Sequence, residues 1–529
     1  MQQYEYVFQH GAKLYSRVFD SETKTSKLYS LLLNECVPEL YIPTKEATEY
    51  VSHANNKQHL KKKEFETTKE MKQYLDSNKD LLNIHGNVNP VMKFIRDNFP
   101  DTIASTHEFR THFIDIETRS VFGFPDYKDP KEEITLIQVY DNFEQVYYIL
   151  GTKEYNNTKT YNYGRVEYIK CDNELDVLNR WFALVKKLDP TILVGFNTFS
   201  FDYPYIINRC REIGLKPERL SPIGVIKEKE AETKDGIAYI HYEILGRILL
   251  DYRELYLKYS YAKLPKHNLE TIVSYELGEG KIDHGEYDSF EEFYKNDYQK
   301  FVEYGIKDVE LLVALDKKLK MIDTAKFIGY LCGVNVTDVM GTYKQWFSYV
   351  YNSCMAIGEI LPLSQMYSKE DDVFIGGWVV SNPGKYEWLV SFDFASLYPS
   401  EIHTLNLGLD TFIPDKELHE DLLALRRDYF FWYNDKKNED LCKEKNNNQQ
   451  EFEHIKFLIE NKEHIHSVLV KHNVTASPNG YFYSKEKQGV LPTLLRGLLD
   501  KRKEEKKKME ACEKMIYEIE KEISSRTKS

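Results

Sequence analysis

The sequence predicts a multidomain protein of mixed class, in which an α/β part is followed by an α+β part. Three observations predict this. The chain has 529 residues, more than one hydrophobic core usually organises. From about Thr111, apolar strand-like runs alternate with helical stretches. Further strand-like runs occur between Ile375 and Ser400, and the residues from Leu491 onward have the pattern of one long helix.

The amino-acid composition limits the kinds of function that the protein can have. The net charge of −13 argues against a surface that attracts nucleic acid everywhere, although a local basic groove is compatible with it. Carboxylates that hold Mg²⁺ would themselves add negative charge. The sequence has no run of about 18 apolar residues, and its start lacks signal-peptide features, so we expect a protein that is not exported. Its seven scattered cysteines argue against a disulfide framework and a zinc ribbon.

The α/β pattern covers the strand-like runs HFIDIET, ITLIQVY and TILVGF and the helical stretch NELDVLNRWFALVKKL. Asp235 and Gly236 separate two β-rich runs, which predicts a protruding hairpin because Asp-Gly accepts positive φ at a turn. The first hundred or so residues mix β-like and helix-prone stretches. No catalytic pattern is visible there.

Three short patterns carry candidate chemistry. Asp115 and Glu117 stand two apart on a strand-like run and so share a face. Asp202 follows a strand and a polar turn and comes near a helix start. Tyr304 and Asp308 stand four apart on a helical stretch and also share a face. Taken singly, each pattern has a plainer interpretation. The first is usually a solvated strand edge, the second is typical of a helix cap, and the third is typical of a surface pair.

In this order, D-x-E, N-x₃-F-D and Y-x₃-D resemble the three motifs of the DnaQ-like, RNase H-like 3′→5′ exonucleases. The resemblance implies a two-metal site for Mg²⁺, with Mn²⁺ as a substitute, and carboxylates are the ligands that these hard cations prefer. It implies that the metal ligands are Asp115, Glu117, Asp202 and Asp308. Tyr304 would position the attacking water, and Asn197 and Phe201 would contact the end of a single strand of DNA.

Residues 391 to 402, SFDFASLYPSEI, form the most specific string of the sequence. They resemble motif A of the family B DNA polymerases, and a buried strand with a capping Asp is the alternative. Asp393 at a strand end could hold Mg²⁺ together with the backbone carbonyl of Phe394. A tight turn from Leu397 to Pro399 would shape the nucleotide pocket. By the resemblance, Tyr398 would pack under the sugar, and Ser396 and Leu397 would line the triphosphate pocket.

Two further segments extend this resemblance. FIGGWV resembles the Y-x-G-G/A element that contacts the template, with Phe374 where the family has tyrosine; Gly376 and Gly377 would allow close approach to DNA phosphates. SPNGYFYSKEKQGVLPTLLRGLLDKRKEEKKKM resembles the entry to the fingers, where Arg502 and Lys506, four apart, would contact the incoming triphosphate. A solvated charged helix is the alternative for the second segment.

The resemblance predicts a domain order. It is an N-terminal domain (1–105, with 320–362 returning to it), an exonuclease domain (106–319), a partial palm (363–487) and the first helix of the fingers (488–529). Residues of about 416–472 have the charged, Asn/Gln-rich composition of a surface insertion, and we predict no chemistry for them.

Overall, the sequence resembles the front part of a family B polymerase of the T-even bacteriophage type. The strings K-x₃-N-S-x-Y-G and D-T-D of that family do not occur in it. We therefore expect a complete proofreading exonuclease and half a polymerase site, working in the cytoplasm of an infected bacterium. Expected partners are single-stranded DNA, primer-template, deoxynucleoside triphosphates, a second chain with the remaining palm, fingers and thumb, and a sliding clamp bound through that chain; no membrane is expected. The alternatives are a stand-alone exonuclease with a relic palm and a non-catalytic nucleic-acid-binding regulator.

Overall fold

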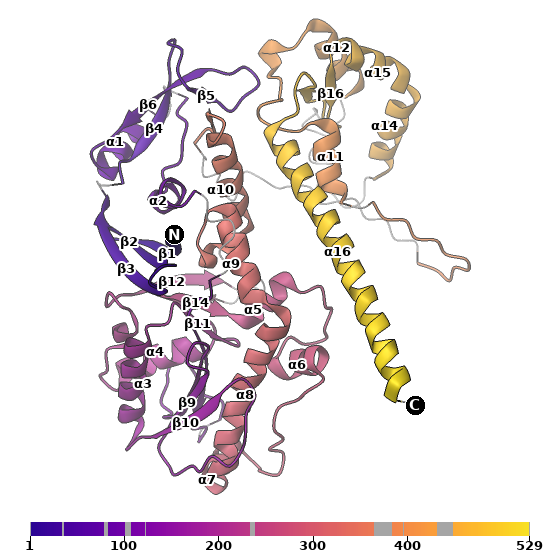
Figure 1. Cartoon of the computed structure of the whole chain (residues 1–529). Helices are drawn as coiled ribbons and strands as arrows, with labels where there is room; N and C mark the ends of the chain where they lie inside the picture. The colour runs from indigo at the N-terminus through magenta and orange to yellow at the C-terminus, as the bar shows by residue number, and fades with distance from the viewer. Residues whose placement is uncertain are drawn as a thin grey trace. The chain divides into compact units, whose positions relative to one another are not determined.

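The computed structural model describes residues 2–33, 36–78, 83–100, 107–121, 123–232, 238–363, 383–394, 396–430 and 448–527. They form two compact units (Figure 1). Unit 1 comprises Met1–Val37 and Asn89–Tyr349, and unit 2 comprises Pro38–Val88 and Val350–Ser529. Asp235, Gly236, Phe374, Gly376 and Gly377 lie outside the described residues.

A six-stranded sheet in the order β10-β9-β8-β7-β11-β14 forms the centre of unit 1. Its strands are β7 (Thr111–Thr118), β8 (Ile134–Asp141), β9 (Val146–Gly151), β10 (Arg165–Lys170), β11 (Ile192–Gly195) and β14 (Ile248–Asp251). Strand β7 pairs antiparallel with β8 and parallel with β11, and β11 pairs parallel with β14. Every residue of β8 is buried, as expected of a strand covered on both faces. The predicted α/β rhythm is confirmed.

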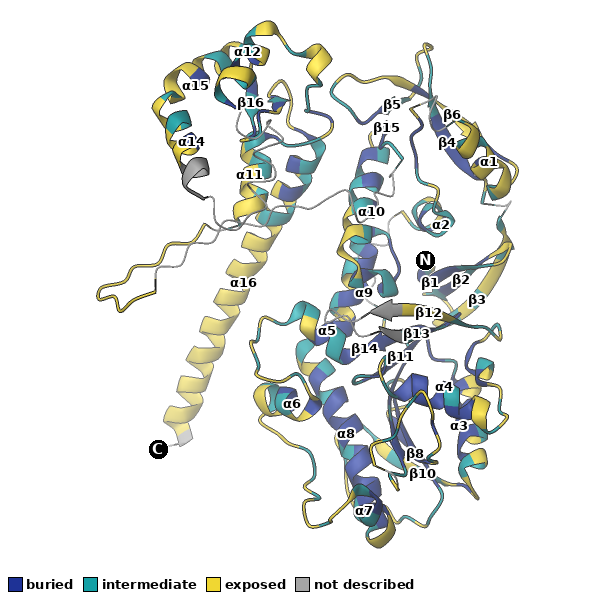
Figure 2. Cartoon of the chain, turned by 180° about the vertical axis from the view of Figure 1, so that it is seen from behind, coloured by how far each residue is buried: buried dark blue, intermediate teal, exposed yellow. Residues whose placement is uncertain are grey.

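Helices cover both faces of this sheet (Figure 2). On one face Ile114, Ile116 and Val139 join the core of α3 (Glu174–Leu188) and α4 (Asp202–Glu212). On the other face Phe113 and Tyr140 join the core that includes α8 (Tyr298–Leu319). The remaining helical elements of this part are η3 (Pro217–Leu220), α5 (Tyr252–Tyr259), α6 (Leu269–Leu277) and α7 (Phe290–Asn296).

The predicted hairpin and a small N-terminal sheet complete unit 1. Strands β12 (Ile226–Glu232) and β13 (Ala238–Ile244) pair antiparallel. The N-terminal sheet has the order β1-β2-β3, with β1 (Gln2–His10), β2 (Lys13–Asp20) and β3 (Thr25–Leu32), and α2 (Pro90–Asn98) packs against β1. Helix α9 (Met321–Cys332) also reaches β1, because the Tyr330 hydroxyl donates to the carbonyl of Tyr4 at 2.7 Å. The elements η4 (Val336–Met340) and α10 (Thr342–Met355) follow.

Unit 2 contains a four-stranded sheet in the order β15-β5-β6-β4. Its strands are β4 (Glu39–Pro43), β5 (Tyr50–Ser52), β6 (His59–Glu64) and β15 (Glu359–Ile360), and α1 (Thr68–Asn78) follows β6. The late strand β15 pairs with the early strand β5, and His53 Nδ1 lies 2.9 Å from Glu359 Oε2. A segment near residue 360 thus returns to the N-terminal part. The functional domain boundaries stay a prediction, since compactness alone does not define them.

The rest of unit 2 is mostly helical. It comprises α11 (Leu397–Leu405), η5 (Asp415–Glu417), α12 (Glu420–Tyr429), α14 (Asn448–Glu460), α15 (Lys462–Lys471), the hairpin of β16 (Val474–Ala476) and β17 (Phe482–Ser484), and α16 (Val490–Thr527). The long helix predicted from Leu491 is confirmed. Leu422, Leu425 and Ile465, within 416–472, share a small core with Phe482, which lies outside that segment.

The predicted strand before motif A is wrong for the described residues 383–394, which form neither helix nor strand. Their side chains are exposed; Phe392, for example, is 93% exposed. A strand needs a neighbour to pair its backbone groups, and no strand of the described chain lies beside this segment. The tight turn predicted from Leu397 to Pro399 is also wrong, because these residues form the first turn of α11.

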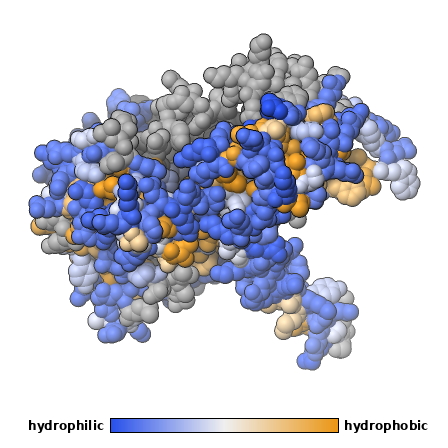
Figure 3. All heavy atoms as spheres, turned by 90° about the horizontal axis from the view of Figure 1, so that it is seen from above, coloured by the Kyte–Doolittle hydropathy of each residue, from blue (hydrophilic) through white to orange (hydrophobic). Residues whose placement is uncertain are grey.

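Among the described residues, no helix has the length and apolar character needed to cross a membrane. The face drawn in Figure 3 is mostly hydrophilic, with hydrophobic residues in scattered patches.

Candidate active site

Strand β7 places two carboxylates on one face of the central sheet. Asp115 and Glu117 alternate with Ile114 and Ile116, which are buried on the opposite face against α3 and α4. Both carboxylates therefore point to the side that α8 covers. Glu117 is 8% exposed. Directly after Glu117, the register of the pairing between β7 and β8 shifts.

Helix α8 supplies a third carboxylate. Tyr304 and Asp308 lie one turn apart on it and are both buried. The carboxylates of Asp115, Glu117 and Asp308 each have an oxygen within 4.8 Å of the others. The structure thus brings together three acidic residues that are far apart in the sequence, with the hydroxyl-bearing Tyr304 beside them.

Asp202 lies beside this group rather than within it. It is the first residue of α4, and the N-cap position belongs to Phe201, so Asp202 is not a capping residue. Burial raises the pKa of Asp202, and the nearby backbone of Ile116, between the two acidic residues of β7, opposes that rise. The negative charge of Asp202 acts on both Asp115 and Glu117. Asp202 therefore belongs to the electrostatics of the site.

Burial and mutual repulsion disfavour ionised carboxylates here. Burial first, and then the neighbouring Glu117, raise the pKa of Asp115. Burial and the charge of Asp308 raise the pKa of Glu117. Burial and the charge of Asp251 raise the pKa of Asp202 to about 7. Because the cluster gathers more negative charge than the fold neutralises, it is suited to bind cations.

One cation of the chain already reaches the cluster. The Lys281 ammonium donates to Asp308 Oδ2 at 2.6 Å and to the Tyr304 hydroxyl at 3.2 Å. Burial lowers the pKa of Lys281, but the Asp308 carboxylate outweighs that effect and raises it overall. The second oxygen of Asp308, Oδ1, is buried and accepts no hydrogen bond. An oxygen-rich cluster with a free buried oxygen fits a divalent cation.

Asp251 holds the turn that precedes Asp202. It lies at the end of β14 and accepts hydrogen bonds from the backbone of Asn197 at 3.0 Å and of Phe199 at 3.1 Å. Asn197 has φ +65°, a left-handed conformation that asparagine tolerates better than most residues. Burial raises the pKa of Asp251 to about 6 despite these bonds. The turn is therefore fixed to the sheet.

An aromatic pair adjoins Asp202, since Phe201 directly precedes it. Phe201 packs against Phe124, with ring centroids 5.5 Å apart, and Phe124 is 88% exposed. Exposed aromatic rings are platforms on which nucleobases stack. Phe124 lies outside the three motifs, so the sequence reasoning missed it.

A glycine lets α8 approach the sheet closely. Gly305 follows Tyr304, and a Cβ on it would lie 1.9 Å from Nε2 of Gln138, the β8 residue paired with Asp115. The Gln138 side chain is buried and makes no hydrogen bond. Lys281, Asp251, Phe124 and Gly305 were all absent from the sequence prediction. For Gly305 a signal existed, since a glycine inside a helical pattern often marks a close contact.

The residues predicted for a polymerase site are not gathered in this way. Asp393 and Phe394 lie in the exposed irregular segment, and among the described residues Asp393 belongs to no group of three or more metal-binding side chains. Ser396 has φ +56° and precedes α11, on which Leu397 and Tyr398 are exposed. Arg502 and Lys506 are exposed on α16, which packs against α11.

Comparisons with known proteins identify both halves of the chain. The profile for the exonuclease domain of DNA polymerase family B matches residues 36–272, and the profile for DNA polymerase family B matches residues 340–523. Together they cover most of the chain.

Similar proteins include two phage enzymes and a eukaryotic one. The DNA-directed DNA polymerase of Escherichia phage RB69 is 26% identical over 80% of this chain and 45% of its own length. That of Enterobacteria phage T4 is 27% identical over 82% of this chain and 46% of its own length. The DNA polymerase delta catalytic subunit of Caenorhabditis elegans is 28% identical over 50% of this chain and 26% of its own length. The chain spans less than half the length of these relatives, and with its exonuclease and polymerase parts it belongs to DNA polymerase family B.

Proposed function

We propose that this chain is a proofreading 3′→5′ exonuclease and the front part of a phage replicative DNA polymerase. The observation that carries the exonuclease proposal is the meeting of Asp115, Glu117 and Asp308 within 4.8 Å, with Tyr304 beside them. Acidic residues from a strand and a helix have no structural reason to be buried together, because their repulsion costs stability. A hydrolytic metal site gives them one.

The cluster would hold two Mg²⁺ ions through Asp115, Glu117 and Asp308, with Asp202 contributing charge or a bound water; Mn²⁺ suits the same oxygen donors. When bound, such ions make water a nucleophile and stabilise the charge of a phosphodiester under attack. The Tyr304 hydroxyl, on the same helix face as Asp308, would orient that water. Lys281 would leave the carboxylate or move toward the phosphate as the ions bind.

The surroundings of the cluster suit a single strand of DNA. Asn197, on the turn fixed by Asp251, would donate hydrogen bonds to the terminal nucleotide. Phe201 and the exposed Phe124 would stack on its bases, because stacking does not depend on sequence. Editing of any mismatched primer end requires this kind of contact.

For polymerisation we propose that a second chain supplies the remaining palm, fingers and thumb. A lone Asp393 cannot hold two cations against a triphosphate, and its segment has no strand beside it in the described chain. Once these neighbours are in place, Asp393 and the Phe394 carbonyl would bind Mg²⁺. Ser396, Leu397, Tyr398, Arg502 and Lys506 would contact the nucleotide. Gly376 and Gly377 would approach the template.

Helix α16 offers a surface for such a chain. Met509, Ile516, Ile519 and Ile523 are each more than half exposed. Together with exposed Cys512 they repeat at alternating intervals of three and four residues, the spacing of a coiled-coil seam. The occupant we propose is an antiparallel helix of the complementary polymerase part. More than half of the length of the phage relatives lies outside the region that matches this chain, and we expect that helix to belong to it. A sliding clamp would bind through that part, and the assembly would act in the host cytoplasm.

The exposed position of Asp393 also favours a second candidate, an exonuclease in which the palm segment only binds DNA. A primer-template assay with Mg²⁺ separates the two. We expect the chain alone to shorten primers, and to extend them with deoxynucleotides only when the complementary chain is present. Absence of shortening would overturn the exonuclease proposal. Failure of every complementary polymerase fragment to bind or to restore extension would favour the second candidate.

The seam is tested separately, by co-purification with the complementary fragment. Replacing Ile516 and Ile523 by Lys should abolish co-purification, whereas Lys501→Ala on the exposed surface of the same helix should leave it intact. Binding that survives both isoleucine changes would exclude this seam.

A further inference from the structure

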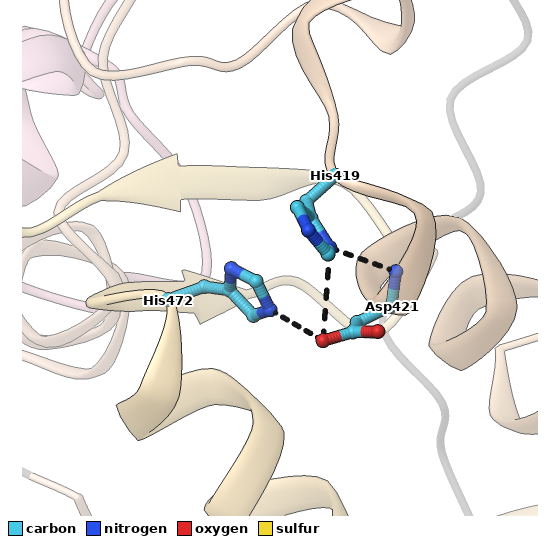
Figure 4. Close-up of side chains that lie close together, drawn as sticks. All are labelled: His419, Asp421 and His472. Atoms are coloured by element: carbon cyan, nitrogen blue, oxygen red, sulfur yellow. Dashed lines mark hydrogen bonds and ion pairs between the residues drawn. The ribbon is translucent and has the colours of Figure 1, made fainter.

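A second cluster of metal-binding side chains lies away from the exonuclease site, in unit 2 (Figure 4). His472 Nε2 donates to Asp421 Oδ2 at 3.0 Å, and His419 Nδ1 lies 3.6 Å from the same oxygen. The two imidazole rings face each other with centroids 4.6 Å apart. One nitrogen of each histidine and one Asp421 oxygen all lie within 4.8 Å of one another.

The cluster joins the two ends of the charged insertion. His419 caps the start of α12, and Asp421 is the second residue of that helix. His472 directly follows α15 and is its C-cap residue. Residues of about 416 and 472 are the ends of the insertion that the composition of the sequence predicts. The three side chains therefore meet at its base.

The cluster retains ligand character in the absence of a metal. Asp421 Oδ2 accepts from the Lys471 ammonium and from His472 Nε2, so one carboxylate oxygen faces the cluster. Lys471 lies 2.5 Å from the oxygen that both histidines approach, but its side chain is 65% exposed and can swing into water. The backbone N–H of Asp421 donates to His419 Nδ1 and, at an exposed helix start, can be satisfied by water instead.

Donor chemistry selects the kind of cation. Two neutral imidazoles and a carboxylate suit Zn²⁺ and its first-row neighbours, whereas Mg²⁺ prefers oxygen donors alone. Zn²⁺ with nitrogen and oxygen ligands takes bonds of about 2.0–2.2 Å, so its ligand atoms lie roughly 3–4 Å apart. The separations of 3.0 and 3.6 Å to Asp421 Oδ2 lie in this range, and the two histidine nitrogens lie within 4.8 Å of each other.

We propose that His419, Asp421 and His472 bind one transition-metal ion of the Zn²⁺ type, with water completing its coordination. The ion would tie the start of α12 to the end of α15 and so close the base of the insertion. The displaced Lys471 would then be free to face solvent or DNA. This site is independent of the exonuclease and polymerase assignments, because it shares no residue with either.

The test is a Zn²⁺ titration of the full chain by calorimetry, and a Co²⁺ titration followed by visible absorption. Both are made with excess Mg²⁺ in an Asp115→Ala/Glu117→Ala background, so that the carboxylate cluster does not contribute. We expect one bound ion per chain and a Co²⁺ absorption spectrum that indicates a low coordination number. Zn²⁺ should raise the melting temperature of the protein. His419→Ala/His472→Ala should weaken binding at least about tenfold and abolish the spectrum and the stabilisation.

A matched control is His466→Ala, because His466 is exposed on α15 outside the cluster and should change none of these readouts. Asp421→Asn keeps the side chain's size but removes its charge, and it should also weaken binding. Circular dichroism of each variant without metal separates lost binding from lost folding. Unchanged affinity and spectrum in the double histidine variant, or equal weakening by His466→Ala, would overturn the proposal.

Discussion

The Lys281 ammonium lies 2.6 Å from Oδ2 of Asp308, in the cluster that Asp308 forms with Asp115 and Glu117. It neutralises part of a charge that a divalent cation would neutralise more fully. We therefore expect Lys281 to stabilise the metal-free protein and to compete with a cation for the cluster. Its side chain is 28% exposed, so solvent screens the interaction in part.

Replacing Lys281 by Met should lower the free energy of unfolding of the metal-free protein by about 1–3 kcal/mol. The loss should be smaller in Mg²⁺, because the ion replaces the missing positive charge. Denaturant melts with EDTA and with Mg²⁺ measure both values. Lys295→Met is the control, since Lys295 pairs with Glu291 away from the cluster. An equal loss with and without Mg²⁺ would contradict competition between lysine and metal.

Replacing Asp115 and Glu117 by Ala should reduce Mg²⁺-dependent trimming of single-stranded DNA on the order of 1,000-fold or more, because two of the proposed metal ligands are lost. The fold should persist, since the change also removes charge repulsion from a buried strand. Trimming is measured on end-labelled DNA, with circular dichroism as the control for folding. Undiminished trimming would remove β7 from the active site.

Stability without metal should fall as the pH rises. The folded-state pKa values of Asp115, Glu117 and Asp202 are raised, that of Asp202 to about 7. Their protonated forms therefore stabilise the fold below the unfolded-state pKa of about 4, and this contribution is lost as the pH rises toward 7. Melting temperatures between pH 5 and 8, chosen around these values, should decline in EDTA and decline less in Mg²⁺. Parallel curves would show that the carboxylates are not linked to metal binding.

Part of the site follows from local periodicity. The two-residue repeat of a strand places Asp115 and Glu117 on one face, and helical spacing does the same for Tyr304 and Asp308. Both facts are visible in the sequence. Lys281 is not predictable in this way, because it lies between α6 and α7 and reaches Asp308 only through the packing of the chain.

The features that the sequence did not predict depend on contacts between segments far apart in the chain. The apolar run before Asp393 has the composition of a strand, yet it forms none in the described chain, since a strand needs a neighbour that local sequence does not specify. His419 and His472 likewise meet only because α12 and α15 pack over the same core. The sequence of the insertion indicated a charged surface and nothing about its base.

Gly305 should be intolerant of a methyl group. In most helices Gly→Ala stabilises by up to about 1 kcal/mol, but here the new Cβ would lie 1.9 Å from Gln138 Nε2. Gly305→Ala should therefore cost about 1–3 kcal/mol and slow trimming, because the buried Gln138 side chain or α8 with Asp308 must shift. Gly497→Ala on α16 is the matched control, as nothing lies within 4 Å of that position, and it should be neutral or stabilising. Denaturant melts measure the loss of stability, and trimming rates measure the loss of activity. Equal effects of the two glycine changes would exclude a close approach of α8 to Gln138.

Asp393→Ala should separate the two activities. If Asp393 binds the metal of the polymerase site once the complementary chain is present, its loss should abolish primer extension by the assembled protein. Trimming should remain, because Asp115 and Glu117 lie in unit 1, whereas Asp393 lies in unit 2. Extension and trimming are scored on the same labelled primer, with Asp415→Ala as a control aspartate paired with Arg426. Equal loss of both activities would indicate a folding defect, and retained extension would exclude Asp393 as a ligand.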